Sequence, residues 1–184
     1  DDSLRDTVKK SFEFLDSNKK VLLVGLDLRA PKLLQYLDLN DVPGVSHYIV
    51  DHELTSKDII FPSPSFGNLY IMPSGVIPPN PAEMLMNERL ADLLNEVKET
   101  YDYVIVDTAP VALVTDTLLL AKYADAFVYV TRANFLDKRM LQIPARLVRE
   151  KRLPNMAVLL NGTNSKKGYG YGYGYGYGYG YGTE

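Results

Sequence analysis

Acidic side chains follow two apolar runs of this sequence, at the points where the runs end. Asp107 directly follows the run 103–106, while Asp27 and Arg29 come shortly after the run 21–24. Short, continuous apolar runs are typical of strands buried on both faces of a parallel sheet. A carboxylate at the carboxyl end of such a strand is placed to hold Mg²⁺ beside nucleotide phosphates. We therefore predict a metal site at Asp27 and Asp107 with Arg29 beside it, although Asp107 would equally suit the cap of a following helix.

The elements that must position these residues alternate along the chain. Further apolar runs occur at 69–72, 126–130 and 157–160, and apolar residues recur at helical spacing over 82–100 and 136–151. A capping box at Ser3 predicts another amphipathic helix over residues 4–15. Strands that alternate with helices predict an α/β fold, namely a doubly wound, mostly parallel sheet with helices on both faces.

Composition narrows the class of protein. The chain has 184 residues, 46% of them hydrophobic, which suits one domain with a sizeable core. A formal net charge of −3 with mixed signs provides no broad basic surface, so nucleic acid is not expected as a partner. The sequence has no cysteine, which excludes disulfides and thiolate metal sites and fits a reducing compartment. No apolar run is long enough to span a bilayer, so we expect this chain to be soluble.

The last part of the sequence differs in kind from the rest. Residues 168–182 alternate strictly between glycine and tyrosine and hold seven of the fourteen tyrosines. Glycine at every second position disfavours an ordered strand, so this low-complexity stretch predicts a flexible, solvated arm. We accordingly divide the chain into a folded domain, residues 1–167, and a tail, residues 168–184.

Three motifs together resemble the cytoplasmic catalytic domain of bacterial protein-tyrosine kinases of the capsule and exopolysaccharide type. Asp107 after its apolar run resembles a Walker B strand. Asp27 and Arg29 resemble the family's Walker A′ motif, D-x-D-x-R, which this chain departs from at Gly25. The stretch 71–85, with its Pro-Pro-Asn-Pro-Ala-Glu core, resembles a further family segment, in which Pro81 suits the first position of a helix. The resemblance implies a sheet of the P-loop NTPase type with deviant Walker motifs.

By this resemblance the chain transfers the γ-phosphoryl group of ATP to tyrosine and uses Mg²⁺ held near Asp27 and Asp107. Arg29 would join these two carboxylates in catalysis. The implied acceptors are the tail tyrosines of a neighbouring subunit in a ring, namely Tyr169, Tyr171, Tyr173, Tyr175, Tyr177, Tyr179 and Tyr181. The implied partners are a membrane polysaccharide co-polymerase that activates the kinase and a tyrosine phosphatase. The implied location is cytoplasmic, at the inner face of the cell membrane.

Partitioning and cell-division ATPases with deviant Walker motifs share this type of sheet, but they lack a tyrosine tail. In that wider superfamily an asparagine after the last strand contacts adenine, and Asn161, followed by Gly162, is similar to it. The pair Asn161-Gly162 is equally typical of a simple turn.

The sequence contains no glycine-rich phosphate loop of the form G-x-x-x-x-G-K-[ST]. Such a loop supplies charge-assisted hydrogen bonds to nucleotide phosphates, so without one we expect weak ATP binding. Two interpretations stay open. Either the sequence omits a segment of a working kinase, or the chain is a catalytically inactive relative that serves as a phosphorylated scaffold. A partitioning-type ATPase would also need the loop.

Overall fold

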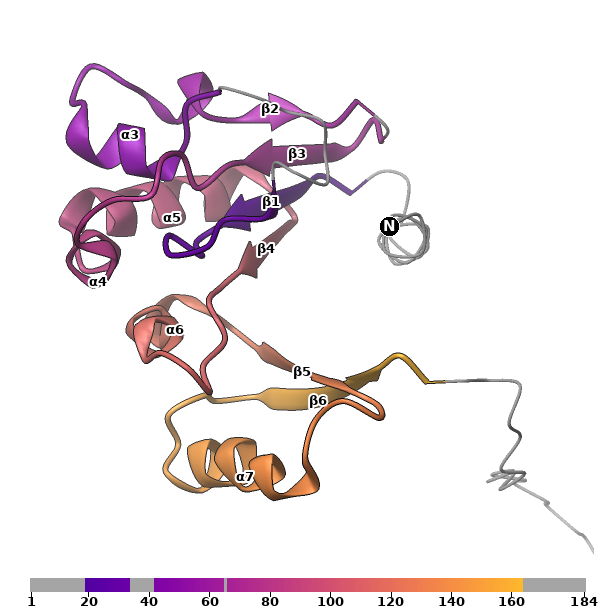
Figure 1. Cartoon of the computed structure of the whole chain (residues 1–184). Helices are drawn as coiled ribbons and strands as arrows, with labels where there is room; N and C mark the ends of the chain where they lie inside the picture. Colours follow the sequence, from indigo (N-terminus) through magenta and orange to yellow (C-terminus); the bar gives the residue numbers. More distant parts are fainter. Residues whose placement is uncertain (1–18, 34–41, 65, 164–184) are drawn as a thin grey trace, which may run out of the picture.

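The computed structural model describes residues 19–33, 42–64 and 66–163 (Figure 1). The helix predicted over residues 4–15 and the tyrosine tail lie outside the described residues. The predicted apolar strands are all present, each within one or two residues of its expected bounds.

The larger sheet contains β1 (Val21–Gly25), β2 (Phe61–Pro62), β3 (Leu69–Met72) and β4 (Tyr103–Asp107). Their order is β2-β3-β1-β4. Strand β1 is parallel to both of its neighbours, whereas the short β2 is antiparallel to β3. The register pairs Gly25 with Asp107, so β1 and β4 end together. The sequence therefore predicted correctly that the carboxyl ends of these two strands meet.

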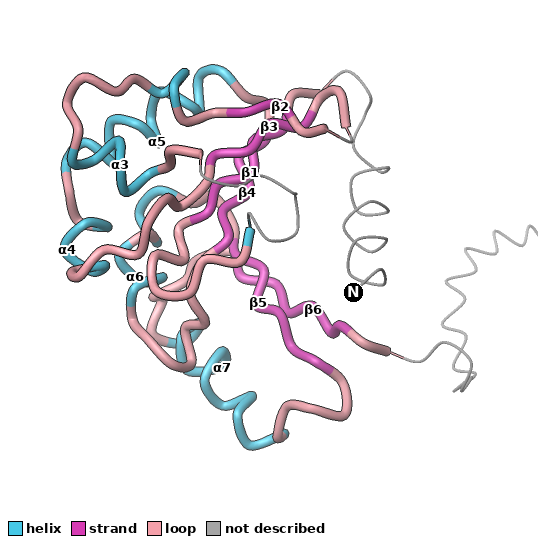
Figure 2. Tube along the Cα trace, turned by 45° about the horizontal axis from the view of Figure 1, so that its top comes forward, coloured by secondary structure: helices cyan, strands magenta, loops and turns pink. Residues whose placement is uncertain are grey.

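The remaining strands, β5 (Phe127–Arg132) and β6 (Met156–Asn161), pair in parallel as a separate two-stranded sheet. Figure 2 shows the strands following one another through the middle of the molecule, with the β5–β6 pair beyond β4. Within the described part of the chain, β4 has no ladder partner on the side away from β1. The described strands thus form two sheets rather than one continuous sheet.

The core lies on one face of the larger sheet, under α3 (Val45–Val50) and α5 (Glu88–Thr100). Alternate residues of β1, Leu22 and Val24, point into it and are fully buried. Helix α5 contributes four leucine and valine side chains at helical spacing, namely Leu90, Leu93, Leu94 and Val97. On the opposite face burial falls across the sheet, since Ile71 of β3 is fully buried but Ile105 of β4 is 42% exposed.

Helix bounds differ from the sequence prediction in two places. The single helix predicted over 82–100 is wrong, because the structure divides it into α4 (Pro81–Leu85) and α5. The backbone N–H of Arg89 donates to the side-chain oxygen of Asn87, which caps α5 and starts a new helix there. The helix predicted over 136–151 is shorter, with the 3₁₀ turn η3 (Lys138–Leu141) leading into α7 (Gln142–Arg149). Pro81 is at the start of α4, as predicted.

Several short elements were not predicted. They are α3, the helix α6 (Asp116–Leu119), and the 3₁₀ turns η1 (Ser56–Asp58) and η2 (Ala121–Tyr123). Each has six residues or fewer, which is too short for a periodic apolar pattern to emerge from the sequence.

Candidate functional site

Asp27 and Asp107 lie close together at the carboxyl edge of the larger sheet. The pairing of β1 with β4 continues one residue beyond β1, where the backbone N–H of Leu26 donates to the Asp107 carbonyl at 2.8 Å. Loss of hydration raises the pKa of Asp107, and the negative charge of Asp27 raises it further. The two carboxylates repel each other at this sheet edge, and a bound divalent cation would offset that repulsion.

The turn after β1 holds Asp27 in place. One of its carboxylate oxygens accepts hydrogen bonds from the backbone N–H groups of Arg29 and Ala30, both at 3.0 Å. These bonds fix the side chain against its own turn. The Asp27 carboxylate is therefore positioned by the backbone of the two to three residues that follow it.

Arg29 has a partner that the sequence did not indicate. Its guanidinium donates two hydrogen bonds to Asp116 at the start of α6, with Nε–Oδ2 at 2.6 Å and an Nη–Oδ1 distance of 3.1 Å. The hydrogen bond to Asp116 is the main cause that raises the pKa of Arg29. The two residues are 87 positions apart, so no local pattern links them. Arg29 was correctly placed at this edge, but in this structure it binds a carboxylate of the protein.

Helix α6 also fastens the loop that follows Asp107. The hydroxyl group of Thr117 donates to the carbonyl oxygen of Ala109 at 2.6 Å, in a buried position. Asp116 is itself only 5% exposed. The loop after β4 and the turn after β1 are thus both tied to the first turn of α6, which makes Asp116 and Thr117 positioning residues that the sequence analysis missed. A Thr-Asp-Thr cluster before an apolar stretch was the available signal.

Gly25 occupies the place where the Walker A′ motif usually has its first aspartate, and the space beside it is small. A Cβ atom at Gly25 would lie 2.6 Å from the Ser74 hydroxyl oxygen and 3.1 Å from the Ser74 backbone nitrogen. The close approach of β1 and the residues after β3 therefore favours glycine here.

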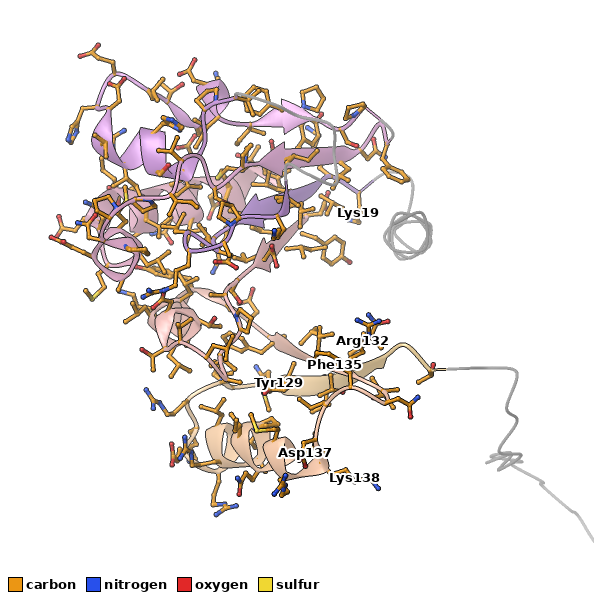
Figure 3. All side chains as sticks on the ribbon, viewed as in Figure 1. Lys19, Tyr129, Arg132, Phe135, Asp137 and Lys138 are labelled. Carbon is orange, nitrogen blue, oxygen red and sulfur yellow. The ribbon has the colours of Figure 1, made fainter. Side chains whose placement is uncertain are left out.

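The structure places Asn161 and Gly162 apart from this group. Asn161 ends β6 in the second sheet, and its side-chain oxygen accepts from the Gly162 N–H at 2.7 Å. Gly162 has φ of 70°, the left-handed conformation that a glycine turn uses. In Figure 3, Arg132 at the end of β5 lies on the same side of the view as Lys19, which precedes β1. In that view the carboxyl ends of β5 and β6 therefore point away from the Asp27 edge, so adenine contact by Asn161 stays a prediction.

The residues present fit a magnesium–nucleotide complex better than a metal held by protein alone. Among the described residues, no group of three or more His, Cys, Asp or Glu side chains is arranged to hold a metal ion. Mg²⁺ commonly binds through one or two carboxylates, with phosphates and water as the other ligands. Asp27 and Asp107 match that donor set. The seven predicted acceptor tyrosines lie outside the described residues.

Residues 6–137 match a protein family described as an AAA domain. The chain belongs to this family. A tyrosine-protein kinase of the cps region of Klebsiella pneumoniae is 33% identical to this AAA-domain chain over 150 residues, which cover 82% of the chain and 20% of the relative. The tyrosine-protein kinase CpsD of Streptococcus agalactiae is 28% identical over 146 residues, covering 79% of the chain and 63% of the relative.

Solved structures agree with these relatives. The kinase domain of the Escherichia coli tyrosine kinase ETK has a TM-score of 0.73 and 28% identity, covering 86% of this chain and 62% of that domain. The MinC:MinD cell division complex of Aquifex aeolicus has a TM-score of 0.63 at 19% identity, which shows the fold alone. These similarities confirm the P-loop NTPase-type fold and the predicted resemblance to bacterial tyrosine-kinase catalytic domains.

The AAA-domain chain spans less than two thirds of the length of these relatives. None of the described helices is long and apolar enough to cross a membrane.

Proposed function

We propose that this chain is the catalytic part of a bacterial tyrosine autokinase that transfers the γ-phosphoryl group of ATP to C-terminal tyrosines. The observation that carries the proposal is the Asp27–Asp107 pair at the joint end of β1 and β4, in a chain whose relatives are named tyrosine-protein kinases. In the transfer, a tyrosine oxygen bonds to the γ-phosphorus, the bond to the bridging oxygen of ADP breaks, and the phenolic proton is released.

The chain's own residues would do three things. Asp27 and Asp107 would hold Mg²⁺, which when bound supplies charge neutralisation for the phosphates. Arg29 would add a positive charge at the same edge, once part of its hydrogen bonding turns from Asp116 to phosphate. Asp116 and Thr117 would keep the two loops in register through α6. Phosphoryl transfer depends on such positioning more than on covalent participation.

We further propose that the tail tyrosines accept phosphate in trans, from a neighbouring subunit of a homo-oligomeric ring. An arm with a tyrosine at every second residue would present acceptors at high local concentration. By analogy with the capsule loci named for the relatives, the cycle would regulate capsular or exopolysaccharide synthesis. A membrane co-polymerase would then be the activator, a tyrosine phosphatase would reset the tail, and the kinase would work at the cytoplasmic face of the membrane.

A mixing experiment tests transfer and its direction. One chain carries Asp107→Asn with its tail intact, and the other carries an intact site with all seven tail tyrosines changed to phenylalanine. After incubation with ATP and Mg²⁺, mass spectrometry should find phosphate on the tail of the Asp107→Asn chain. Phosphate on neither chain, while the wild type alone is labelled, would contradict transfer in trans.

Two observations favour a second candidate, a phosphorylated scaffold without catalytic activity. The sequence has no G-x-x-x-x-G-K-[ST] loop, and Arg29 is paired with Asp116. A scaffold would take up no phosphate from ATP and Mg²⁺ alone, yet it would still be labelled on the tail by a separate active kinase. The wild-type chain incubated with and without such a kinase distinguishes the two candidates.

A further inference from the structure

Two neighbouring hollows lie beyond the carboxyl end of β3, between α3, α4 and the loop that joins β3 to α4. The first has a volume of about 430 Å³ and the second about 260 Å³. They share three lining residues, Ser46, Val50 and Val76. The first continues along Ile77 and the prolines after it to Glu83, and the second reaches Asp51 and Leu54. We call the pair the α3 groove.

The walls of the α3 groove are apolar, exposed and firmly built. Val50 is 72% exposed, Val76 62% and Ile77 61%. Backbone hydrogen bonds from Val45 to Pro73 and from Ser46 to Ser74 fasten α3 to the loop after β3. Contiguous exposed apolar side chains on a rigid frame are typical of a surface that meets another polypeptide.

Ser46 adds a polar feature to this apolar surface. Its hydroxyl oxygen is buried and has no hydrogen-bond partner among the described residues. Gly75 makes this packing possible, since it has φ of 82° and a Cβ there would collide with the Ser46 hydroxyl. Buried hydroxyl groups in native proteins are nearly always paired. The unpaired hydroxyl beside the shared wall of both hollows suits a guest that carries a hydroxyl group of its own.

We propose that the α3 groove docks two successive tyrosines of the Tyr-Gly arm of a second copy of this chain. In an extended segment, residues two apart lie on the same side at a spacing of about 7 Å, so the repeat offers one aromatic ring to each hollow. The ring suits the apolar walls, its hydroxyl suits Ser46, and the intervening glycine permits close backbone approach. This inference rests on the proposed role of the arm as the acceptor and specifies how the arm is held.

Charge supports the same occupant. Lys166 and Lys167 directly precede the repeat, while Asp51 and Glu83 line the two hollows. A phosphate on a docked tyrosine would bring about two negative charges against these carboxylates. The groove should therefore prefer unmodified arms and release phosphorylated ones. Strand β3 is parallel to β1, so the groove and Asp27 both lie beyond the carboxyl ends of neighbouring strands. A docked arm would therefore have further tyrosines to offer to the carboxylate pair.

Peptide binding to the full chain tests the proposal. A fluorescently labelled synthetic peptide with the sequence of residues 166–184 is titrated with the 184-residue chain without ATP, and its anisotropy gives the affinity. We expect Val76→Asp to weaken binding about tenfold or more, because the new charge would be buried under an aromatic ring. Leu113→Asp is the matched control, since Leu113 is 80% exposed and does not line the groove.

Two further arms of the experiment test the chemistry. Replacing the peptide tyrosines with phenylalanine should weaken binding to the wild type but not to Ser46→Ala, as a double-mutant cycle requires if the two hydroxyl groups meet. A peptide with phosphotyrosines should bind about tenfold more weakly than the unmodified peptide. Equal affinity of the wild type, Val76→Asp and Leu113→Asp for the unmodified peptide would overturn the proposal.

The outcomes separate this inference from the proposed function. If Val76→Asp leaves peptide binding unchanged while the chain still phosphorylates its tail, the docking inference is overturned and the kinase proposal stands. If the peptide binds in the groove but no phosphate is transferred from ATP, docking is supported and the chain is the scaffold.

Discussion

The three side chains that the proposed reaction needs differ in how firmly hydrogen bonds hold them in this structure. Asp27 is fixed by two backbone N–H groups of its own turn, whereas Arg29 is held by a distant carboxylate. Among the residues that the structure describes, no hydrogen-bond donor or cation holds the Asp107 carboxylate in this way, and both lost hydration and the charge of Asp27 raise its pKa. A carboxylate with a raised pKa beside a second carboxylate at a sheet edge is typical of a functional site.

Asp107→Asn should therefore separate stability from function. In metal-free buffer near pH 7 the variant should have a Tm at least as high as the wild type, because it removes an unfavourable charge. Nucleotide with Mg²⁺ should raise the Tm of the wild type and leave that of the variant unchanged. Thermal unfolding of both proteins checks this, and a large loss of Tm in the variant without ligand would contradict it.

The pH dependence of stability gives an independent test at the same residue. The folded-state pKa of Asp107 is raised above the unfolded value of 3.8. Its contribution to stability is thus fully present below pH 3.8 and is lost as the pH rises through the raised folded-state pKa. The difference in unfolding free energy between wild type and Asp107→Asn should move in favour of the variant over that window. A difference that is constant with pH would contradict the raised pKa.

We expect Asp116 to affect the rate of tail phosphorylation by orienting Arg29. Asp116→Asn keeps the shape of the side chain but removes the charge that orients the guanidinium, so tail phosphorylation should slow about tenfold or more. The rate of phosphate incorporation, followed by mass spectrometry, checks this. Asp92→Asn on the exposed face of α5 is the control and should match the wild type. Equal rates for Asp116→Asn and the control would contradict the proposal that Asp116 positions Arg29.

At the scale of elements, the division between α4 and α5 shapes the region next to the site. Helix α4 begins at Pro81 and α5 begins after the cap at Asn87. The break lets the chain turn, so that α5 packs Leu90 and Leu93 into the core while Glu83 and Asn87 line the α3 groove. In a single continuous helix, the faces on which Glu83 and Asn87 lie relative to Leu90 and Leu93 would be set by the helical repeat alone.

Asn87→Ala should weaken this cap. The substitution removes the acceptor for the Arg89 N–H and should lower the unfolding free energy by about 1 kcal/mol. Asn95→Ala, within the same helix and exposed, is the matched control and should be neutral or slightly stabilising. Urea unfolding of both variants measures the difference, and equal effects would mean that the cap contributes nothing.

At the scale of the whole molecule, charge links the tail to assembly. The chain carries a formal net charge of −3. Each phosphotyrosine adds about −1.5 to −2, so seven would add roughly −10 to −14. Repulsion of that size between neighbouring tails should loosen the proposed ring.

Light scattering before and after phosphatase treatment measures this effect. The phosphorylated chain should have the lower molar mass, and added salt should reduce the difference because it screens the charges. A chain with the seven tyrosines changed to phenylalanine is the control and should not respond. An unchanged mass of the wild type on dephosphorylation would contradict control of assembly by the tail.

The sequence alone determined the parts of this protein that local patterns encode. Continuous apolar runs predicted the major strands, which the structure confirms. The same runs led to the prediction of a site at Asp27, Arg29 and Asp107, because parallel strands bring their carboxyl ends to one edge. The tertiary structure decided what depends on distant segments. Examples are the Asp116 partner of Arg29, the separate β5–β6 sheet and the α3 groove around Ser46. These features arise from contacts between residues far apart in the chain, which leave no periodic or spacing signal in the sequence.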